Sequence, residues 1–204
     1  MQDEFNILEK TPCSLPAPYG KDLTSEGEKL NEDEKKIYQS GVGKLLFLIR
    51  YLHPDILNAV RELSKWISDR ATIHHKKVML QTMNYILHIC NRRLHLNLIM
   101  EMSNARKEKF IVKGQCDSNY ATNEETRKSV SGIEVTLNGI PVVIRSVGQK
   151  IVVLLVTKAE LIALAQAVQE MLYVICLLES MQLQVQNPMI VECNNKGAVN
   201  ICNT

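Results

Sequence analysis

The sequence lacks the usual features of membrane and secreted proteins. No uninterrupted apolar run reaches the roughly 20 residues that a membrane-spanning helix needs, and the run at residues 151–156 has the length of a strand. The first ten residues are acidic and have no apolar centre, so no secretion signal is visible. Internal repeats and low-complexity tracts are also missing. We therefore expect a globular protein of the cytoplasm or nucleus, without a membrane segment.

The six cysteines show no pattern typical of a metal site. None belongs to a C-x-x-C pair, and no spacing between cysteines and histidines suits zinc. Cys90, Cys116 and Cys176 lie inside apolar segments, and free cysteine is among the residues most often buried. We therefore interpret the cysteines as buried free thiols.

Composition and charge fit a soluble chain of one large or two small domains. The 204 residues are 46% apolar and 23% charged, which are both ordinary values. Residues 1–37 hold five basic and nine acidic side chains, whereas the remainder holds 19 and 13, so that an acidic leader precedes a mildly basic body. This balance is compatible with nucleic-acid contact but does not establish it.

The first part of the chain is expected to be an acidic, proline-containing leader, residues 1–37, followed by a helical unit, residues 38–103. Pro54 ends the first helix of that unit and suits the first turn of the second, while Thr72 suits the N-cap of the third. The three segments with apolar residues at helical spacing are residues 38–52, 54–69 and 72–91.

The rest of the chain has the pattern of an α/β domain, residues 104–204, and an alternating run at residues 94–100 predicts a strand just before it. Short β-rich runs with turn signals such as Asn138-Gly139 precede a long helix at residues 158–181, a further strand and a final helix. The order β-β-β-α-β-α predicts a mixed sheet with an antiparallel start. The residues of the long helix expected to face the core are Leu161, Leu164, Ala165, Val168, Leu172, Ile175 and Leu178.

Three polar side chains of this domain stand where they can converge. Asp117 directly follows a predicted strand, Glu160 lies in the first turn of the long helix, and Asn194 directly follows another strand. Carboxylates that converge in this way can hold two Mg²⁺ ions, which activate a water and stabilise the leaving oxygen in phosphodiester hydrolysis. Alternatively, Asp117 is a turn residue at a strand end and Glu160 is a favourable charge near a helix N-terminus.

The order of short motifs along the chain resembles the Pol polyprotein of copia-type LTR retrotransposons. Motifs similar to its ribonuclease H domain are GQCDSNYA (114–121), RKSVSG (127–132), TKAELIAL (157–164) and VECNNKGAV (191–199). Motifs similar to the reverse transcriptase region before that domain are TPC (11–13), YQSGVGKLLFL (38–48), HPDI (53–56) and VRELSKW (60–66). Each motif is modest by itself, but this order is hard to obtain by chance.

The resemblance implies a reverse transcriptase connection-like unit and an RNase H-like domain, which hydrolyses the RNA strand of RNA–DNA hybrids with Mg²⁺ or Mn²⁺. It puts Asp117 and Glu160 at catalytic, metal-binding positions. Asn194 stands where the family has an acid, and the family's fourth acid belongs to a later segment that this sequence does not contain. Because a neutral amide offers less charge to two neighbouring cations, we expect the activity to be lost or severely impaired.

Basic residues are further candidates for contact with nucleic acid. Arg127 and Lys128 match a basic pair of the family. A second basic run that could bind a phosphate backbone consists of His74, His75, Lys76 and Lys77. Alternatively, this run is only a solvated helix face. Three functions stay open: an inactive retroelement remnant, a residually active ribonuclease H, and a non-catalytic module that binds nucleic acid or protein. A second copy of the chain or another Pol segment is a further possible partner, because it would complete the fold.

Overall fold

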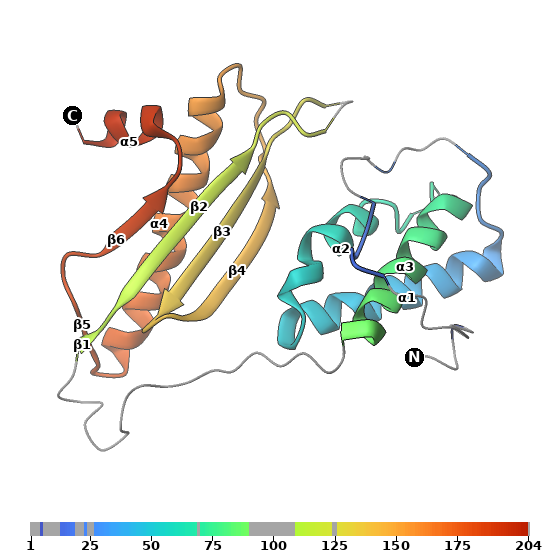
Figure 1. Cartoon of the computed structure of the whole chain (residues 1–204), viewed down its shortest axis with the longest axis horizontal. Coiled ribbons are helices and arrows are strands. Elements are labelled where there is room, and N and C mark those ends of the chain that lie inside the picture. The colour runs from blue at the N-terminus through green and yellow to red at the C-terminus, as the bar shows by residue number, and fades with distance from the viewer. Residues whose placement is uncertain are drawn as a thin grey trace. The chain divides into compact units, whose positions relative to one another are not determined.

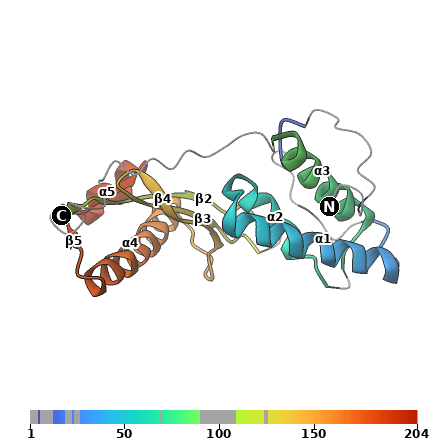
Figure 2. The ribbon, with the colours of Figure 1, turned by 90° about the horizontal axis from the view of Figure 1, so that it is seen from below.

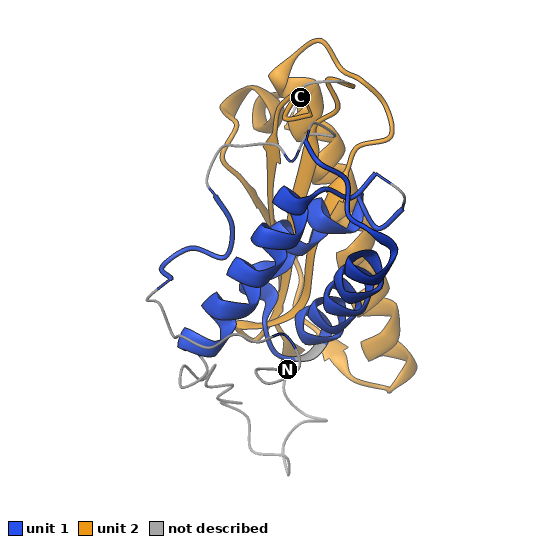
Figure 3. Ribbon diagram, turned by 90° about the vertical axis from the view of Figure 1, so that its right-hand side faces the viewer, with its two compact units in different colours: residues 1–94 blue, residues 95–204 orange. Residues whose placement is uncertain are grey.

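The computed structural model describes Phe5, residues 13–18, Leu23, and residues 27–68, 70–89, 109–123 and 126–203. The chain divides into two compact units, residues 1–94 and 95–204, which Figure 3 shows in different colours. Each unit has a hydrophobic core of its own. The predicted strand at residues 94–100 and the predicted domain boundary at residues 103–104 lie outside the described residues.

The first helix, α1 (Glu32–Tyr51), begins before the expected start at Tyr38. A capping box fixes its N-terminus, since the Asn31 side-chain oxygen accepts from the Glu34 backbone N–H at 2.8 Å and the Glu34 carboxylate accepts from the Asn31 N–H at 3.3 Å. The acidic residues of the first turn also interact favourably with the helix dipole. The charged stretch that the sequence analysis assigned to the leader therefore starts a helix.

Parts of the predicted leader also pack against the core of the first unit. Leu23 is buried, and Phe5 and Cys13 contact the core cluster. The Thr82 hydroxyl donates a hydrogen bond to the carbonyl oxygen of Pro16 at 2.8 Å. The expectation of an unpacked arm is therefore wrong for these residues.

A 3-10 turn (Pro54–Ile56), helix α2 (Leu57–Ser64) and helix α3 (Ile73–Ile89) complete the helical unit (Figure 1). Pro54 starts the turn as predicted, although α2 ends before the expected limit near residue 69. The Tyr38 hydroxyl of α1 donates to the Leu63 carbonyl oxygen of α2 at 2.7 Å, inside the core. The largest fully buried side chains of this unit include Tyr38, Leu45, Ile56, Leu63, Met79 and Met83.

The second unit is built on a four-stranded mixed sheet with the order β4-β3-β2-β6 (Figure 1). Strands β2 and β3, and β3 and β4, pair antiparallel, whereas β2 and β6 pair in parallel. The strands are β2 (Val112–Asn119), β3 (Val130–Leu137), β4 (Ile140–Gly148) and β6 (Ile190–Cys193), and a separate two-stranded sheet joins β1 (Lys109–Phe110) to β5 (Gln184–Val185). The helices are α4 (Val156–Ser180) and α5 (Lys196–Cys202). The predicted α/β class is confirmed, and the arrangement is consistent with an RNase H-like fold.

The turn between β3 and β4 follows its sequence signal. Asn138 and Gly139 both have positive φ, at 50° and 81°. This conformation matches the right-handed twist of a two-residue hairpin turn and is favoured by the Asn-Gly pair. The predicted hairpin is therefore confirmed.

Helix α4 packs along one face of the sheet, which Figure 2 shows from a second direction. Its contact face is made of Ala159, Ala163 and Ala167, all without exposed surface, together with Met171. A Cβ atom at Gly114 of β2 would overlap Met171 Sδ, so helix and strand approach closely there. Close approach requires small side chains, and the sheet-facing side of α4 therefore differs from the predicted one. Of the predicted core residues, Ile175 and Leu178 are buried, Leu161 and Leu164 are half-buried, and Ala165, Val168 and Leu172 are exposed.

Helix α4 is also long and apolar enough, by length and composition, to cross a membrane. The sequence analysis counted only uninterrupted apolar runs and therefore did not single out this helix. About a third of its most apolar stretch is buried inside the protein, and the alanine face rests on the sheet. The core helix of a soluble protein has the same properties, and α4 is compatible with that role.

Candidate functional site

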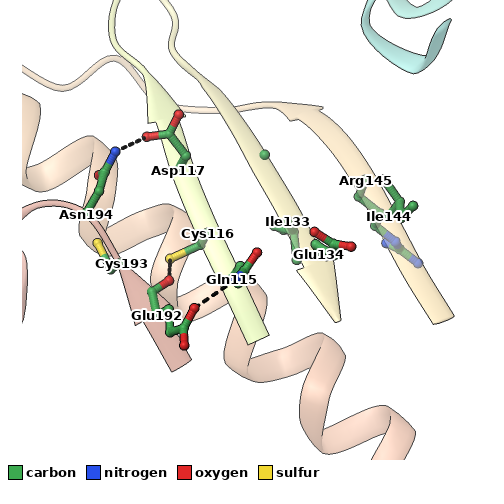
Figure 4. A pocket seen from close by; sticks show the side chains of 11 residues that line it. Gln115, Cys116, Asp117, Ile133, Glu134, Ile144, Arg145, Glu192, Cys193 and Asn194 are labelled. Atoms are coloured by element: carbon green, nitrogen blue, oxygen red, sulfur yellow. Dashed lines mark hydrogen bonds between the residues drawn. The ribbon is translucent and has the colours of Figure 1, made fainter. Parts of the chain in front are cut away.

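The parallel pairing of β2 with β6 brings Asp117 and Asn194 together. Cys116 is the register partner of Cys193, so the next residue of each strand lies at the same end of the pair. The Asn194 side-chain amide donates a hydrogen bond to Asp117 Oδ1 at 3.2 Å (Figure 4). Both side chains are exposed. The two positions singled out at strand ends therefore do meet in the fold.

Glu160 approaches the same strands from the opposite side. Because α4 begins at Val156, Glu160 lies in its second turn rather than its first, and its side chain is 4% exposed. Its carboxylate contacts the thiol of Cys193 at 3.9 Å. Burial alternates along β2, with Cys116 facing α4 and Asp117 facing away from it. The two carboxylates thus flank β2 rather than sharing one face of the sheet.

Two thiols that sequence analysis did not assign to the site separate these carboxylates. Cys116 and Cys193 are neighbours on adjacent strands, and the Cys116 thiol donates weakly to the Glu192 carbonyl oxygen at 3.7 Å. Burial, together with the neighbouring Cys193, Glu160 and Asp117, disfavours the thiolate and raises the pKa of Cys116 to about 12. The signal for this pair was the position of each cysteine immediately before Asp117 and Asn194. The two cysteines form a thiol layer beneath the site, in which Cys116 is a neutral thiol.

The face of the sheet that carries Asp117 is an open groove of about 530 Å³. Three carboxylates line it, those of Asp117, Glu134 and Glu192, and the Gln115 amide donates to Glu192 at 2.7 Å (Figure 4). Arg145 is also part of the lining, but its guanidinium pairs with Glu170 of α4 at 2.8 Å. Without bound cations, such a groove repels the phosphates of a nucleic acid.

Asp117, Glu160 and Asn194 are the side chains that would have to supply the ligands of a two-ion magnesium centre. Mg²⁺ requires oxygen ligands in near-octahedral geometry, and two such ions need negative charge between them. Here Asp117 and Glu160 lie on different sides of β2, and Asn194 contributes a neutral amide that already donates to Asp117. Among the described residues, no group of three or more His, Cys, Asp or Glu side chains is placed to hold a metal ion. The residues present do not fit a two-ion centre.

Arg127 and Lys128 lie in the connection between β2 and β3, at the same end of these strands as Asp117. The Asn123 side chain accepts from the Thr126 backbone N–H at 2.6 Å, and the Asn123 carbonyl accepts from the Arg127 N–H at 2.7 Å. Arg127 is exposed and has a φ of 55°, whereas Lys128 is half-buried. The described part of the turn therefore presents one exposed cation, Arg127, at the same end of the strands as Asp117.

The second predicted basic run is only partly available for contact. His74 and Lys77 are exposed, but His75 has no exposed surface, and its Nδ1 accepts from the Thr72 backbone N–H at 3.0 Å. Burial, with a smaller contribution from the neighbouring His74, lowers the pKa of His75 to about 4. Lys76 pairs with Glu34 at 2.9 Å. A phosphate contact by His75 is therefore excluded in this structure, because the helix turns that side chain into the core.

Comparison with known proteins finds relatives over nearly the whole chain. The chain is 27% identical over 198 residues to the retrovirus-related Pol polyprotein from transposon RE1 of Arabidopsis thaliana, covering 97% of this chain and 13% of that protein. It is 27% identical over 204 residues to the Pol polyprotein from transposon TNT 1-94 of Nicotiana tabacum, covering 98% of this chain and 14% of that protein. Over nearly its whole length, this chain is thus similar to retrovirus-related Pol polyproteins from copia-type transposons.

The chain spans about 13–14% of the length of these Pol polyproteins. It is also 33% identical over 133 residues to secreted RxLR effector protein 161 of Plasmopara viticola, which covers 65% of this chain and 87% of the effector. The effector and this chain are therefore related in sequence. No family model matches the chain, and no solved structure matches it.

Proposed function

We propose that this chain is a Pol segment made of a reverse transcriptase connection-like unit and an RNase H-like domain, and that it does not cleave RNA–DNA hybrids. The hydrogen bond from the Asn194 amide to Asp117 carries this proposal. In a working two-metal site the same two positions would both supply charged oxygens to the cations. Here one position is a hydrogen-bond donor directed at the other.

The electrostatics of this pair work against metal binding. Asp117 is a carboxylate, so the only favourable orientation of the Asn194 amide turns its NH₂ group towards Oδ1 and its oxygen away. A metal ion that used both side chains as ligands would require the Asn194 amide to rotate, which breaks this hydrogen bond, and would gain only one neutral oxygen from Asn194. Two closely spaced divalent cations would then lack the charge that offsets their repulsion. The loss of one member of such a unit typically costs several orders of magnitude in rate.

Nucleic-acid binding without cleavage is a second candidate function. The exposed Arg127 in the turn between β2 and β3 favours this function, because its positive charge can bind a phosphate. The carboxylates of the groove would instead repel a phosphate. One or two such contacts support only weak, sequence-independent binding. This function requires no metal and no change at Asn194.

The test of the main proposal is cleavage of a labelled RNA–DNA hybrid by the full chain in Mg²⁺ and in Mn²⁺, with Asn194→Asp as the restoring variant. Asn195→Asp is the matched control: it makes the same change one residue away, and Asp keeps the N-cap of α5, where Asn195 Oδ1 accepts from Ala198 N–H at 2.9 Å. We expect no cleavage by the native chain or by Asn195→Asp. Cleavage by the native chain that is abolished by Asp117→Asn would overturn the proposal and establish residual ribonuclease H activity.

The result for Asn194→Asp then locates the defect. Cleavage by this variant alone would show that the amide is the lesion in an otherwise competent fold. If the variant is also inactive, Glu160 beneath Cys193 is the second obstacle. Hybrid binding is measured separately, and Arg127→Ala is expected to weaken it and to reduce its salt dependence by about one released ion.

A further inference from the structure

The side of α4 that faces away from the sheet carries an apolar stripe of five residues, called here the outer stripe. Their spacing of four, three, four and four residues places all of them on one side of a helix with 3.6 residues per turn. Val168 is 38% exposed and Leu172 49% exposed, Ala165 and Cys176 are exposed, and Leu161 is half-buried. The outer stripe consists of Leu161, Ala165, Val168, Leu172 and Cys176. Exposed apolar patches of this kind are typical of interaction surfaces.

Opposite charges mark the two ends of the outer stripe. Lys158 and Glu179 are both exposed, and together with Ala165 and Leu172 they recur at intervals of seven residues. Seven residues are close to two helical turns, so the two charges lie in line with the apolar residues between them. No charged residue belongs to the stripe between these ends. The surface is therefore apolar in the middle, positive at the N-terminal end of α4 and negative at the C-terminal end.

This pattern is complementary to itself when two α4 helices lie antiparallel. Lys158 then faces Glu179 of the second copy, Leu161 faces Cys176, and Ala165 faces Leu172. The midpoint of each pair along the helix lies between Val168 and Gln169. A single two-fold axis through this point therefore relates the two members of every pair. Small Ala165 opposite large Leu172 also lets the two surfaces interdigitate. A parallel pair would instead place like charges together at both ends.

We propose that a second copy of this chain docks antiparallel on the outer stripe of α4, forming a symmetric homodimer. The charge pattern favours this occupant over a bilayer, because a membrane surface gives no reason for opposite charges at the two ends. It also favours a second copy over an unrelated apolar segment, because the three pairs fall into register on one axis. Each ion pair and each flanking apolar pair occurs twice in the dimer.

The first experiment measures the dissociation constant of the full chain by sedimentation over a wide concentration range. Leu172→Glu is expected to weaken the dimer about a hundredfold, because a charge enters the apolar centre twice. Leu177→Glu is the matched control: Leu177 is 50% exposed on the same helix but lies about 140° around it from Leu172. The control is expected to keep the dimer within about threefold.

Charge reversal tests the antiparallel register independently of the apolar centre. Lys158→Glu and Glu179→Lys are each expected to weaken the dimer about tenfold, since each places like charges opposite one another at both ends. The double variant restores opposite charges and is expected to recover the native dissociation constant. Both residues are exposed, so folding of the variants, checked by circular dichroism, is expected to be unchanged.

Covalent trapping gives the orientation directly. In a Leu161→Cys variant, oxidised glutathione is expected to join residue 161 of one copy to Cys176 of the other. The two thiols lose two electrons and two protons, and the oxidant is reduced to two glutathione thiols. Adding Cys176→Ser is expected to prevent this cross-link. The proposal would be overturned if the chain stays monomeric at all concentrations, or if Leu172→Glu leaves the dissociation constant unchanged. It would also be overturned if the chain is a monomer that binds neutral lipid vesicles through Leu172.

Discussion

The amide of Asn194 and the carboxylate of Asp117 are joined by a hydrogen bond of 3.2 Å across the ends of two parallel strands. The bond lets the neutral residue stabilise the fold at a position where a second carboxylate would be repelled. Since two carboxylates at this distance cannot both ionise at their usual pKa, an acid here would destabilise the metal-free protein. With asparagine at position 194, this part of the sheet is therefore stable without a bound cation.

We predict that Asn194→Asp lowers the free energy of unfolding by about 1–2 kcal/mol at pH 7 in the absence of divalent cations, because a hydrogen bond is replaced by like-charge repulsion. Adding 10 mM Mg²⁺ is expected to recover about 1.4 kcal/mol if the ion binds the folded variant with a dissociation constant near 1 mM. Urea unfolding with and without Mg²⁺ measures both effects.

Asn195→Asp is the control for this measurement too, because it adds the same charge while keeping the cap of α5. Its stability is expected to change by less than about 0.5 kcal/mol and to respond to Mg²⁺ as the native chain does. Equal Mg²⁺ responses of the two variants would contradict a specific pairing of positions 117 and 194.

Two glycines of α1 make a second, independent prediction about packing in the first unit. A Cβ atom at Gly41 would overlap Met79 Sδ and lie 3.0 Å from Met83 Cε, whereas one at Gly43 meets nothing within 4 Å. Gly41→Ala is therefore expected to destabilise the chain by about 1–3 kcal/mol through overpacking. Gly43→Ala is expected to stabilise it by about 0.5–1 kcal/mol, because alanine is the better helix former.

Thermal or urea unfolding of both variants checks this pair in one experiment. The two glycines lie in the same helix, so the difference between the variants isolates the contact with α3 from helix propensity. A stabilising Gly41→Ala would show that Met79 moves aside freely and that α1 and α3 do not pack as closely as described.

The order of elements in the second unit was predictable because strand and helix patterns repeat locally along the chain. The core face of α4 was only partly predictable, since the prediction counted large apolar residues, whereas the N-terminal half of the buried face is made of the alanines at positions 159, 163 and 167. Periodicity finds an apolar stripe but cannot choose between two stripes on one helix. The start of α1 was missed for another reason: the Asn31 and Glu34 capping signal lies inside a charged stretch.

The candidate site was predictable only where it depends on strand ends. Asn194 directly follows β6, whereas Asp117 lies inside β2, two residues before that strand ends. Parallel pairing of the two strands up to Cys116 and Cys193 brings these positions together. The position of Glu160 could not be predicted, because it depends on how closely α4 approaches β2. The same approach buries Cys193 against Glu160 and encloses Cys116. Sequence also missed that His75 points inward and that Cys176 is exposed.

The thiol layer beneath the site predicts a difference in cysteine reactivity. The pKa of Cys116 is raised to about 12, and the thiolate is the form that reacts, so alkylation by iodoacetamide at pH 8 is expected to be at least about a hundredfold slower at Cys116 than at exposed Cys202. Peptide mass spectrometry after timed quenching gives both rates in one sample. In denaturant the two cysteines are expected to react at similar rates. Equal rates in the folded chain would show that Cys116 is open to solvent.

The buried His75 predicts how the stability of the chain depends on pH. Its pKa is lowered to about 4 in the folded chain, from about 6.5 when unfolded, so between these values only the unfolded chain takes up the proton. Stability from this group is complete above pH 6.5 and is lost as the pH falls towards 4, by about 3 kcal/mol in total. In His75→Asn, the side-chain oxygen can still accept from the Thr72 N–H but does not titrate, so the fall between pH 6.5 and 4.5 is expected to flatten. His74→Asn changes an exposed neighbour and is expected to keep most of the native dependence of stability on pH. Urea unfolding at several pH values compares the native chain with the two variants. If the free energy of unfolding of all three depends equally on pH, His75 is in contact with water and titrates as an exposed histidine.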